Sequence, residues 1–341
     1  MTATSDRRTT MRRWRGTTWM LLAGMLLVAA GCATGQGPVG PTPTRPPTTA
    51  ARGAPSSGPS SGRIIVVVEE NHSFGQVIGA PQAPFLNRLA GQGTLLTSFF
   101  AITHPSLPNY LAMVSGDTQG ITSDCGGCNV DAPNLVDQLE QAGISWKAYM
   151  EDLPAPCSDA HQAGPYAKKH DPFMYFASIR DHPGRCAKVV PASQLDADLG
   201  AGRLPRFAFI TPNLVHDMHG AGEGGDDRAL MRAADDWLRA LYGKLAASPV
   251  WRDDTRLVVT WDEGHGAGAG GRTGCCGGLA GGGHIPTIVV GSHVPTGRDA
   301  TDYDHYALLR SVEAAFHLPF IGHAGDPTSA TIPAIASRSG R

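Results

Sequence analysis

Short apolar runs that end in polar clusters alternate along this chain with segments of helical spacing. Ile64–Val68 is a continuous β-branched run, which is the pattern of a strand buried on both faces. The other predicted strands cover residues 94–100, 145–150, 206–210, 256–261 and 285–291. The predicted helices cover residues 84–93, 107–115, 134–141, 227–247 and 305–316. Strands that alternate with helices predict an α/β protein, a three-layer sandwich with a mainly parallel central sheet.

Two regions depart from this alternation. Residues 33–61 are Pro, Thr, Ser and Gly with almost nothing apolar, so we expect a disordered tether. Residues 151–191 are irregular and rich in Pro, His and aromatic side chains. We expect this stretch to form a disulfide-pinned insertion around the functional site.

The N-terminus predicts export. An arginine-rich segment precedes the apolar Trp19–Ala30, which is too short to span a bilayer comfortably. Small residues then lead to Cys32, a pattern that favours a lipoprotein in which Cys32 carries the lipid. Simple secretion, with no role for Cys32, is the alternative. We therefore expect an exported protein, either attached to the cell surface or secreted.

Composition narrows the possible partners and the redox compartment. The 341 residues are 41% apolar and 17% charged, with a net charge of −2 and no basic stripe, so nucleic acid is not an expected partner. Apart from Cys32 there are six cysteines, an even number that suits disulfides in an oxidising compartment. We favour the pair Cys157–Cys186. Cys125 and Cys128 pair either with each other or with residues 275 and 276.

Acidic residues follow two of the predicted strands. The first strand ends at Glu69, Glu70 and Asn71, and the strand over 256–261 ends at Asp262 and Glu263. The carboxyl ends of parallel strands meet at one edge of a sheet, so these carboxylates are expected to lie close together. Because unpaired carboxylates repel, a cation would stabilise the cluster. Oxygen ligands favour Mg²⁺, Ca²⁺ or Mn²⁺, and nearby histidines leave Zn²⁺ and iron open.

A serine stands at the start of a predicted helix. Ser106 comes just before Pro108, which is typical of a first helical turn. The free N–H groups and the positive dipole of a helix start favour phosphate, so a serine there is positioned to attack phosphorus. The alternative is an ordinary capping serine.

Five motifs in order carry a specific resemblance. They are Glu70–Phe74 (ENHSF), Ser106–Tyr110 (SLPNY), Thr211–His219 (TPNLVHDMH), Trp261–Gly264 (WDEG) and Tyr303–Glu313 (YDHYALLRSVE). Over residues 63–319 the chain resembles the bacterial phosphoesterase family of acid phosphatases and phosphatidylcholine-type phospholipases C, within the alkaline phosphatase superfamily. The resemblance implies an alkaline-phosphatase-like fold.

The resemblance also implies a role for particular residues. Ser106 would be the nucleophile, and Asn109 would hold a phosphate oxygen. The implied ligands of one or more divalent metal ions are Glu70, Asn71, Asp262 and Glu263. The implied candidates for the general acid or for phosphate contacts are His104, Asp217, His219 and His305.

The sequence thus leads to a functional hypothesis with alternatives. We expect an exported, metal-dependent phosphoesterase that hydrolyses small phosphate monoesters through Ser106, of the acid phosphatase type. The alternatives are a phospholipase C-type phosphodiesterase and an inactive surface binding protein. A membrane is an expected partner only through a lipid anchor at Cys32. The expected regions are a signal peptide (1–31), a tether (32–62), a phosphoesterase catalytic domain (63–325) and a tail (326–341).

Overall fold

The computed structural model describes residues 62–220, 226–252, 254–265 and 281–336. The predicted signal peptide, the tether up to residue 61, Cys32, Cys275 and Cys276 lie outside these residues. No helix in the described ranges combines the length and the apolar character needed to cross a bilayer.

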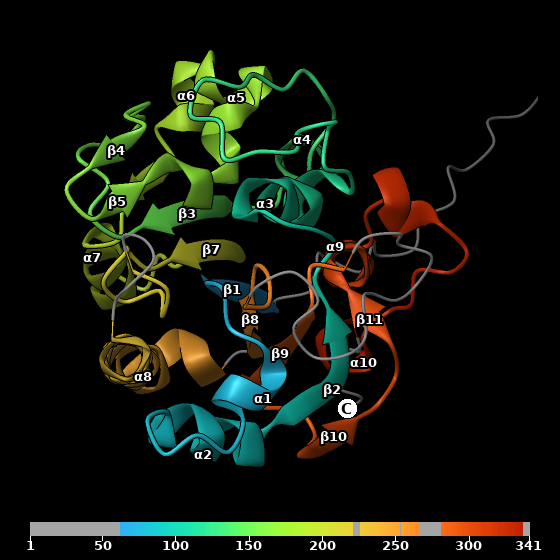
Figure 1. The fold of residues 1–341 in the computed structure, drawn as a ribbon. Coiled ribbons are helices and arrows are strands. Elements are labelled where there is room, and N and C mark those ends of the chain that lie inside the picture. The colour runs from blue at the N-terminus through green and yellow to red at the C-terminus, as the bar shows by residue number, and fades with distance from the viewer. Residues whose placement is uncertain (1–61, 221–225, 253, 266–280, 337–341) are drawn as a thin grey trace, which may run out of the picture. The chain divides into compact units, whose positions relative to one another are not determined.

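Nine strands of the described part form one mixed sheet (Figure 1). From one edge to the other its main path is β10 (Gly297–Asp299), β2 (Thr94–Phe100), β9 (His284–Gly291), β8 (Thr255–Trp261), β1 (Arg63–Glu69), β7 (Phe207–Thr211), β3 (Trp146–Met150) and β6 (Val189–Pro191). β11 (Tyr303–Asp304) pairs with β2. β9 is antiparallel to β2 and β8, and the other strand pairs of this sheet among the described residues are parallel. The mainly parallel sheet predicted from the sequence is confirmed.

Helices cover both faces of the sheet (Figure 1). On one side α2 packs against α8, and on the other α3 packs against α9, which also contacts α10. The α-helices are α1 (Phe74–Val77), α2 (Pro84–Gln92), α3 (Ser106–Ser115), α4 (Leu135–Gln141), α5 (Ala177–Arg180), α6 (Pro183–Cys186), α7 (Gln194–Gly200), α8 (Asp227–Ala247), α9 (His305–Phe316) and α10 (Pro333–Ala336). The predicted three-layer sandwich is therefore confirmed.

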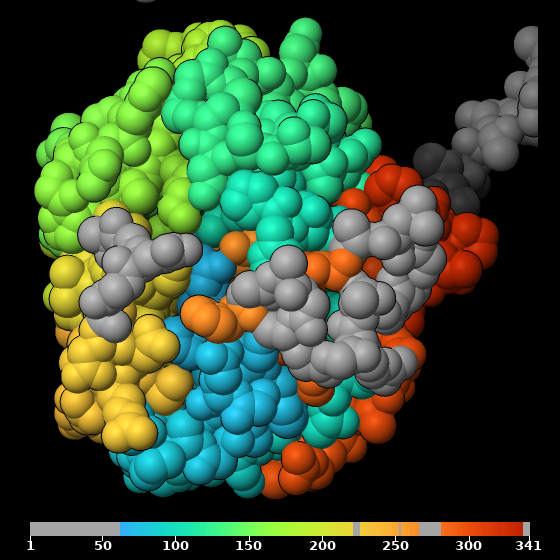
Figure 2. All heavy atoms as spheres, in the orientation of Figure 1, coloured from blue at the N-terminus to red at the C-terminus, as the bar shows by residue number. Residues whose placement is uncertain are grey.

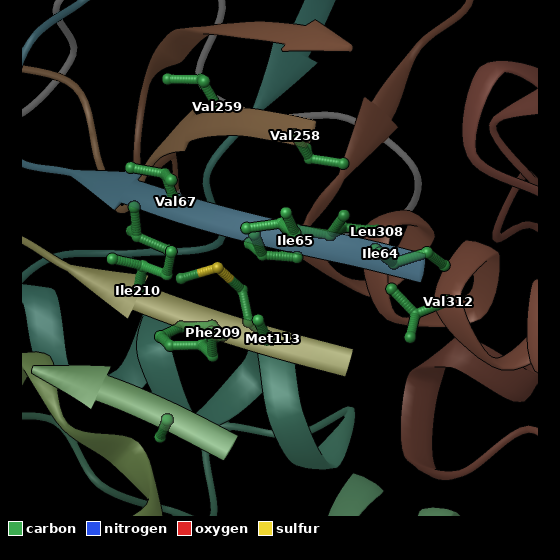
Figure 3. Packing of buried hydrophobic residues seen from close by; sticks show 14 of the residues in the cluster. Ile64, Ile65, Val67, Met113, Phe209, Ile210, Val258, Val259, Leu308 and Val312 are labelled. Carbon is green, nitrogen blue, oxygen red and sulfur yellow. The ribbon is translucent and has the colours of Figure 1, made fainter. Parts of the chain in front are cut away.

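Burial explains why β1 lies at the centre of the sheet. Every residue of β1 after Arg63 is buried, as expected for a β-branched run between two parallel neighbours. Figure 3 shows Met113 of α3 and Val312 of α9 among the side chains of the central strands. Leu86 of α2 and Leu238 of α8, on the other side of the sheet, belong to the same buried cluster, so both helix layers and the sheet share one hydrophobic core.

One buried acid on α8 has a structural role. Asp235 lies on the apolar face of α8, where its carboxylate accepts the backbone N–H groups of Phe85 (3.0 Å) and Leu86 (2.8 Å). These are among the N–H groups that the first turn of α2 leaves without a partner inside the helix. Asp235 thus caps α2 from a neighbouring helix, which accounts for a carboxylate in an otherwise apolar stripe.

The insertion between β3 and β7 contains short elements. They are the hairpin of β4 (Gln162–Ala163) and β5 (Tyr166–Ala167), the 3₁₀ turns η1 (Lys168–His170) and η2 (Pro172–Tyr175), and then α5, α6 and β6. The predicted disulfide Cys157–Cys186 is present and pins this stretch. Cys125 pairs with Cys128, which settles one of the alternatives left open by the sequence. Two further 3₁₀ turns, η3 (Pro249–Arg252) and η4 (Gly322–Gly325), lie outside the insertion.

Candidate active site

The carboxyl ends of β1 and β8 meet, as the sequence predicts. The two strands are parallel and Glu69 is in register with Trp261, so the acidic residues that follow them are neighbours. The backbone N–H of Asn71 donates to Asp262 Oδ1 at 3.0 Å. Asn71 has a φ of +52°, a left-handed conformation that asparagine tolerates better than most residues. This turn directs the chain away from the sheet directly after Glu70.

Ser106 is the first residue of α3 and is buried against the acidic cluster. Its hydroxyl donates to Glu70 Oε2 at 3.1 Å. The next N–H of the helix, that of Leu107, donates to Asp124 Oδ1 at 2.9 Å. The helix start predicted at Ser106 is therefore present, and the carboxylate of Asp124, which lies outside the helix, accepts one of its free N–H groups.

Lys169 and His170 complete the surroundings of Ser106, and the sequence analysis did not identify either. Both belong to η1 in the insertion. Lys169 Nζ lies 3.3 Å from Ser106 Oγ and 3.4 Å from Glu70 Oε2. His170 Nε2 lies 3.0 Å from Glu70 Oε1, and its ring stacks on Tyr110. The only signal in the sequence was the prediction that the insertion surrounds the site.

The charges of Glu70 and Lys169 stabilise each other. Burial alone would raise the pKa of Glu70, but His170 and Lys169 hold it well below its ordinary value. Burial alone would lower the pKa of Lys169, but Glu70 and Asp124 raise it above its ordinary value. Ser106 thus lies between a carboxylate and an ammonium group that both remain charged at neutral pH.

The loop after β7 supplies Asp217 and His219. The backbone N–H of Glu70 donates to the carbonyl of Asp217 at 2.8 Å, which ties this loop to the end of β1. Asp217 Oδ1 accepts the N–H groups of His219 and Gly220, both at 2.9 Å. Burial raises the pKa of Asp217 to about 6. His219 Nδ1 lies 2.9 Å from Asn71 Nδ2, at the edge of the cluster.

Asn109 and His104 organise the segment before Ser106. Asn109 Oδ1 accepts the N–H groups of Ile102 and Thr103 at 3.0 and 3.1 Å, and its Nδ2 donates to the carbonyl of Thr103 at 2.8 Å. His104 Nδ1 lies 2.9 Å from Glu263 Oε2. The hydrogen bond to Glu263 raises the pKa of His104 above its ordinary value. The amide of Asn109 therefore holds the loop that leads into α3.

His305 is buried behind Asp262. Its Nε2 lies 2.7 Å from the carbonyl oxygen of Asp262, and burial lowers its pKa to about 4. A neutral imidazole in this position fixes the backbone of Asp262 rather than facing the solvent. All ten residues singled out by the sequence thus lie on the segments that form this cluster, although Asn109 and His305 bond mainly to backbone atoms.

Several ligand atoms in the cluster suit a cation. Among the described residues, Glu70, His170 and Asp217 each offer an atom within 4.8 Å of the others. The buried atoms here that make no hydrogen bond to another described residue include Glu70 Oε1, Asp217 Oδ2, Asp262 Oδ2 and His170 Nε2. His170 Nε2 lies 3.0 Å from Glu70 Oε1, close enough for one cation to contact both atoms. Burial, and then the charges of Glu70 and Glu263, raise the pKa of Asp262 well above its ordinary value.

Part of this cluster reaches the surface, because the side chains of Lys169 and His219 are 21% and 32% exposed whereas that of Glu70 is fully buried. Figure 2 shows the blue surface of the segment that begins with β1 between the green insertion and the orange segment that follows β8. The same three segments carry Glu70, Lys169 and Asp262.

Comparison with solved structures identifies the class of fold. A protein of the alkaline phosphatase superfamily from Vibrio parahaemolyticus matches with a TM-score of 0.50 and 16% sequence identity, over 79% of this chain and 72% of that one. At this identity the likeness concerns the fold. The α/β sandwich is therefore alkaline-phosphatase-like, as the sequence predicts.

Comparison of sequences identifies the family. The model of the phosphoesterase family matches residues 80–319, and the chain belongs to this family. A phosphatidylinositol-3-phosphatase from Mycobacterium tuberculosis is 35% identical over 274 residues, 80% of this chain and 82% of that protein. A phosphate-repressible acid phosphatase from Penicillium chrysogenum is 30% identical over 322 residues, 89% of this chain and 72% of that protein. The protein is a hydrolase that acts on phosphoester bonds.

Proposed function

We propose that this protein is an exported, metal-dependent phosphatase that hydrolyses phosphate monoesters through Ser106. The observation that carries the proposal is the position of the Ser106 hydroxyl, at the start of α3, 3.1 Å from Glu70 Oε2 and 3.3 Å from Lys169 Nζ. Serine becomes a nucleophile when a neighbouring group accepts its proton or stabilises its negative charge. Here Glu70 accepts the hydroxyl hydrogen bond, and Lys169 supplies the stabilising charge.

The reaction then has two steps. Ser106 Oγ forms a bond to phosphorus as the bond from phosphorus to the ester oxygen breaks, and the leaving alcohol takes up a proton. Water next attacks the phosphoserine, which releases phosphate and returns the serine hydroxyl. Two histidines are candidates for the proton donor. His219 lies at the edge of the cluster, and the hydrogen bond from His104 to Glu263 raises the pKa of His104, which favours its protonated form in weak acid.

The donor set fits a divalent cation. Glu70 and Asp262 each have a buried oxygen with no hydrogen bond to another described residue, and Asn71 lies between them. Asp217 and His170 form a second group of possible ligands together with Glu70, so Glu70 belongs to both groups. A bound cation would stabilise the negative charge of the phosphoryl oxygens. Asn109 and His305 act as positioning residues in this arrangement, because their polar atoms hold the loop before Ser106 and the backbone of Asp262.

Both relatives support a monoesterase, since each is named a phosphatase. Hydrolysis of a lipid phosphomonoester, as the name of the mycobacterial relative describes, is the second candidate. Two disulfides among the described residues support export, because such bonds persist in oxidising compartments. Attachment to the membrane through a lipid on Cys32 belongs to the same proposal and rests on the small residues before that cysteine.

The Ser106→Ala variant tests the proposal, with p-nitrophenyl phosphate as substrate. We expect kcat/KM to fall at least about 10³-fold, because the group that bonds to phosphorus is removed. Ser115→Ala is the matched control, since Ser115 is a buried serine of the same helix that bonds only within and just beyond that helix. We also expect chelation to remove the activity of the wild type and a divalent cation to restore it. Near-normal turnover by Ser106→Ala would reject Ser106 as the nucleophile, and full activity of the metal-free protein would reject the requirement for a metal.

A further inference from the structure

Asp124 links two of the groups that surround Ser106. Its Oδ1 accepts the N–H of Leu107, the residue that follows Ser106 in α3, at 2.9 Å. Its Oδ2 lies 3.4 Å from Lys169 Nζ, which is itself 3.3 Å from Ser106 Oγ. One carboxylate therefore contacts both the helix that carries the proposed nucleophile and the cation beside that nucleophile.

The loop that carries Asp124 is fixed to the insertion. The disulfide Cys125–Cys128 closes the chain directly after Asp124. Lys168 Nζ, from the same 3₁₀ turn η1 that provides the cation, donates to the carbonyl of Gly126 at 3.1 Å. Val130 then exchanges two backbone hydrogen bonds of 2.9 Å with the insertion. The carboxylate of Asp124 therefore has a defined position relative to η1.

Two carboxylates hold the ammonium group of Lys169. Glu70 Oε2 and Asp124 Oδ2 are each 3.4 Å from Lys169 Nζ. The two acids differ in burial, since Glu70 is fully buried whereas the side chain of Asp124 is 31% exposed. A partly exposed ion pair contributes little to folding stability, so removal of the charge of Asp124 should leave the protein folded.

Glu70 has a second role that Asp124 lacks. Glu70 belongs to both groups of proposed metal ligands, whereas Asp124 belongs to neither. A divalent cation on Glu70 would offset the negative charge that attracts Lys169, because the two cations then compete for one carboxylate. Asp124 is the carboxylate that still pairs with Lys169 in that state.

We propose that Asp124 is a positioning residue of the phosphatase site. It fixes the first turn of α3 through Leu107 and keeps the ammonium group of Lys169 beside Ser106, also when Glu70 binds a cation. Asp124 acts through these neighbours and takes no part in the making or breaking of bonds. The inference rests on the proposed function, because it assigns Asp124 a place in the reaction of Ser106.

The variants Asp124→Asn and Asp124→Ala separate the two contacts. Asparagine keeps a side-chain oxygen for the N–H of Leu107 and removes the charge that faces Lys169, whereas alanine removes both. With p-nitrophenyl phosphate we expect kcat to fall about 10-fold for Asp124→Asn, because a displaced cation stabilises the reacting oxygen less, and to fall further for Asp124→Ala. KM should change by less than about 2-fold, since the lysine acts mainly on charge that develops in the transition state.

Asp137→Asn is the matched control. Asp137 accepts the backbone N–H of Asn134 at the start of α4 and pairs with Arg185. Its side chain is 35% exposed, against 31% for Asp124. This variant should leave kcat and KM unchanged, and urea denaturation of each variant measures whether a loss of activity reflects unfolding.

A double-mutant cycle with Lys169→Met identifies how Asp124 acts. In the Lys169→Met background, Asp124→Asn should lower kcat by less than about 2-fold, because the charge that it removes has already lost its partner. An equal loss in both backgrounds, or no loss in the wild-type background, would overturn the assignment. The phosphatase activity, and the test of Ser106, would stand in either case.

Binding of Mn²⁺, measured by calorimetry, gives a readout independent of turnover. In Asp124→Asn the ammonium group of Lys169 has only Glu70 as a carboxylate partner and competes with the cation for it. We therefore expect the Kd for Mn²⁺ to rise about 5-fold in the wild-type background and less than about 2-fold in the Lys169→Met background. Equal changes in the two backgrounds would show a simple effect of net charge and overturn the assignment, as would an unchanged Kd in Asp124→Asn.

Discussion

At the scale of single residues, the site combines groups that the sequence reveals with groups that it hides. Glu70 and Asp262 were predictable because each directly follows a buried strand, and neighbouring parallel strands bring such positions together. Lys169 was not predictable, because it lies 99 residues from Glu70 in an insertion with no regular periodicity. Only the tertiary fold brings its ammonium group to Ser106.

Lys169 provides a prediction at this scale. Lys169→Met keeps the length of the side chain and removes the charge, so Ser106 loses the cation 3.3 Å from its oxygen. We expect kcat to fall about 10²-fold, the usual effect of losing one group that stabilises developing negative charge. Steady-state kinetics on p-nitrophenyl phosphate measure this effect.

A matched control comes from β3. Lys147 has a similar side-chain exposure, 23% against 21% for Lys169, and is also paired with a carboxylate, that of Asp198. Lys147→Met should leave kcat unchanged. If Lys169→Met is folded and retains activity within about 2-fold of the wild type, Lys169 has no part in the reaction.

At the scale of elements, periodicity was a good guide to strands and long helices and a poor guide to the insertion. The apolar runs and the helical spacing correspond to β1, β2, β8, α8 and α9 within a few residues. Residues 151–191 instead fold into short turns and two-residue strands whose shape depends on Cys157–Cys186 and on contacts with distant parts of the chain. Such segments leave little local pattern, so the sequence predicted the Cys157–Cys186 disulfide and the position around the site but none of the short elements.

The Cys157–Cys186 disulfide gives a prediction for this element. Its loop spans a sequence separation of 29 and contains Lys169 and His170. From the chain-entropy model, the variant Cys157→Ala/Cys186→Ala should lose about 3 to 4 kcal/mol of unfolding free energy. We also expect lower activity, because both residues would be held less firmly against Glu70. Urea denaturation measures the first effect.

Cys125→Ala/Cys128→Ala is the comparison. This bridge has a sequence separation of only 3, so the loss of unfolding free energy should be about 2 kcal/mol smaller. Equal losses for the two double variants would contradict an origin in loop closure.

At the scale of the whole molecule, the sheet and its helices form a scaffold for one edge, where the ends of β1 and β8, the start of α3 and the insertion meet. The class of fold was predictable because each element is locally consistent with it. The arrangement of the proposed metal ligands was not predictable from the sequence. Glu263 pairs with His104, and His170 reaches Glu70 from the insertion.

The segment from Trp19 to Ser61 supplies the last prediction. If Cys32 is lipidated and residues 33–61 form the tether expected from their composition, the catalytic domain has a reach of about 30 Å from the membrane, by the square-root scaling of a random coil. We expect the wild type in the membrane fraction of a bacterial host and Cys32→Ser in the soluble fraction, because the single anchoring residue is lost. Immunoblots of both fractions measure this distribution, and thiol labelling of Cys157 and Cys186 in each reports whether the domain reached an oxidising compartment. Identical soluble distributions with the Cys157–Cys186 disulfide formed would reject the lipid anchor and support export. Free thiols at Cys157 and Cys186 in both proteins would reject export itself.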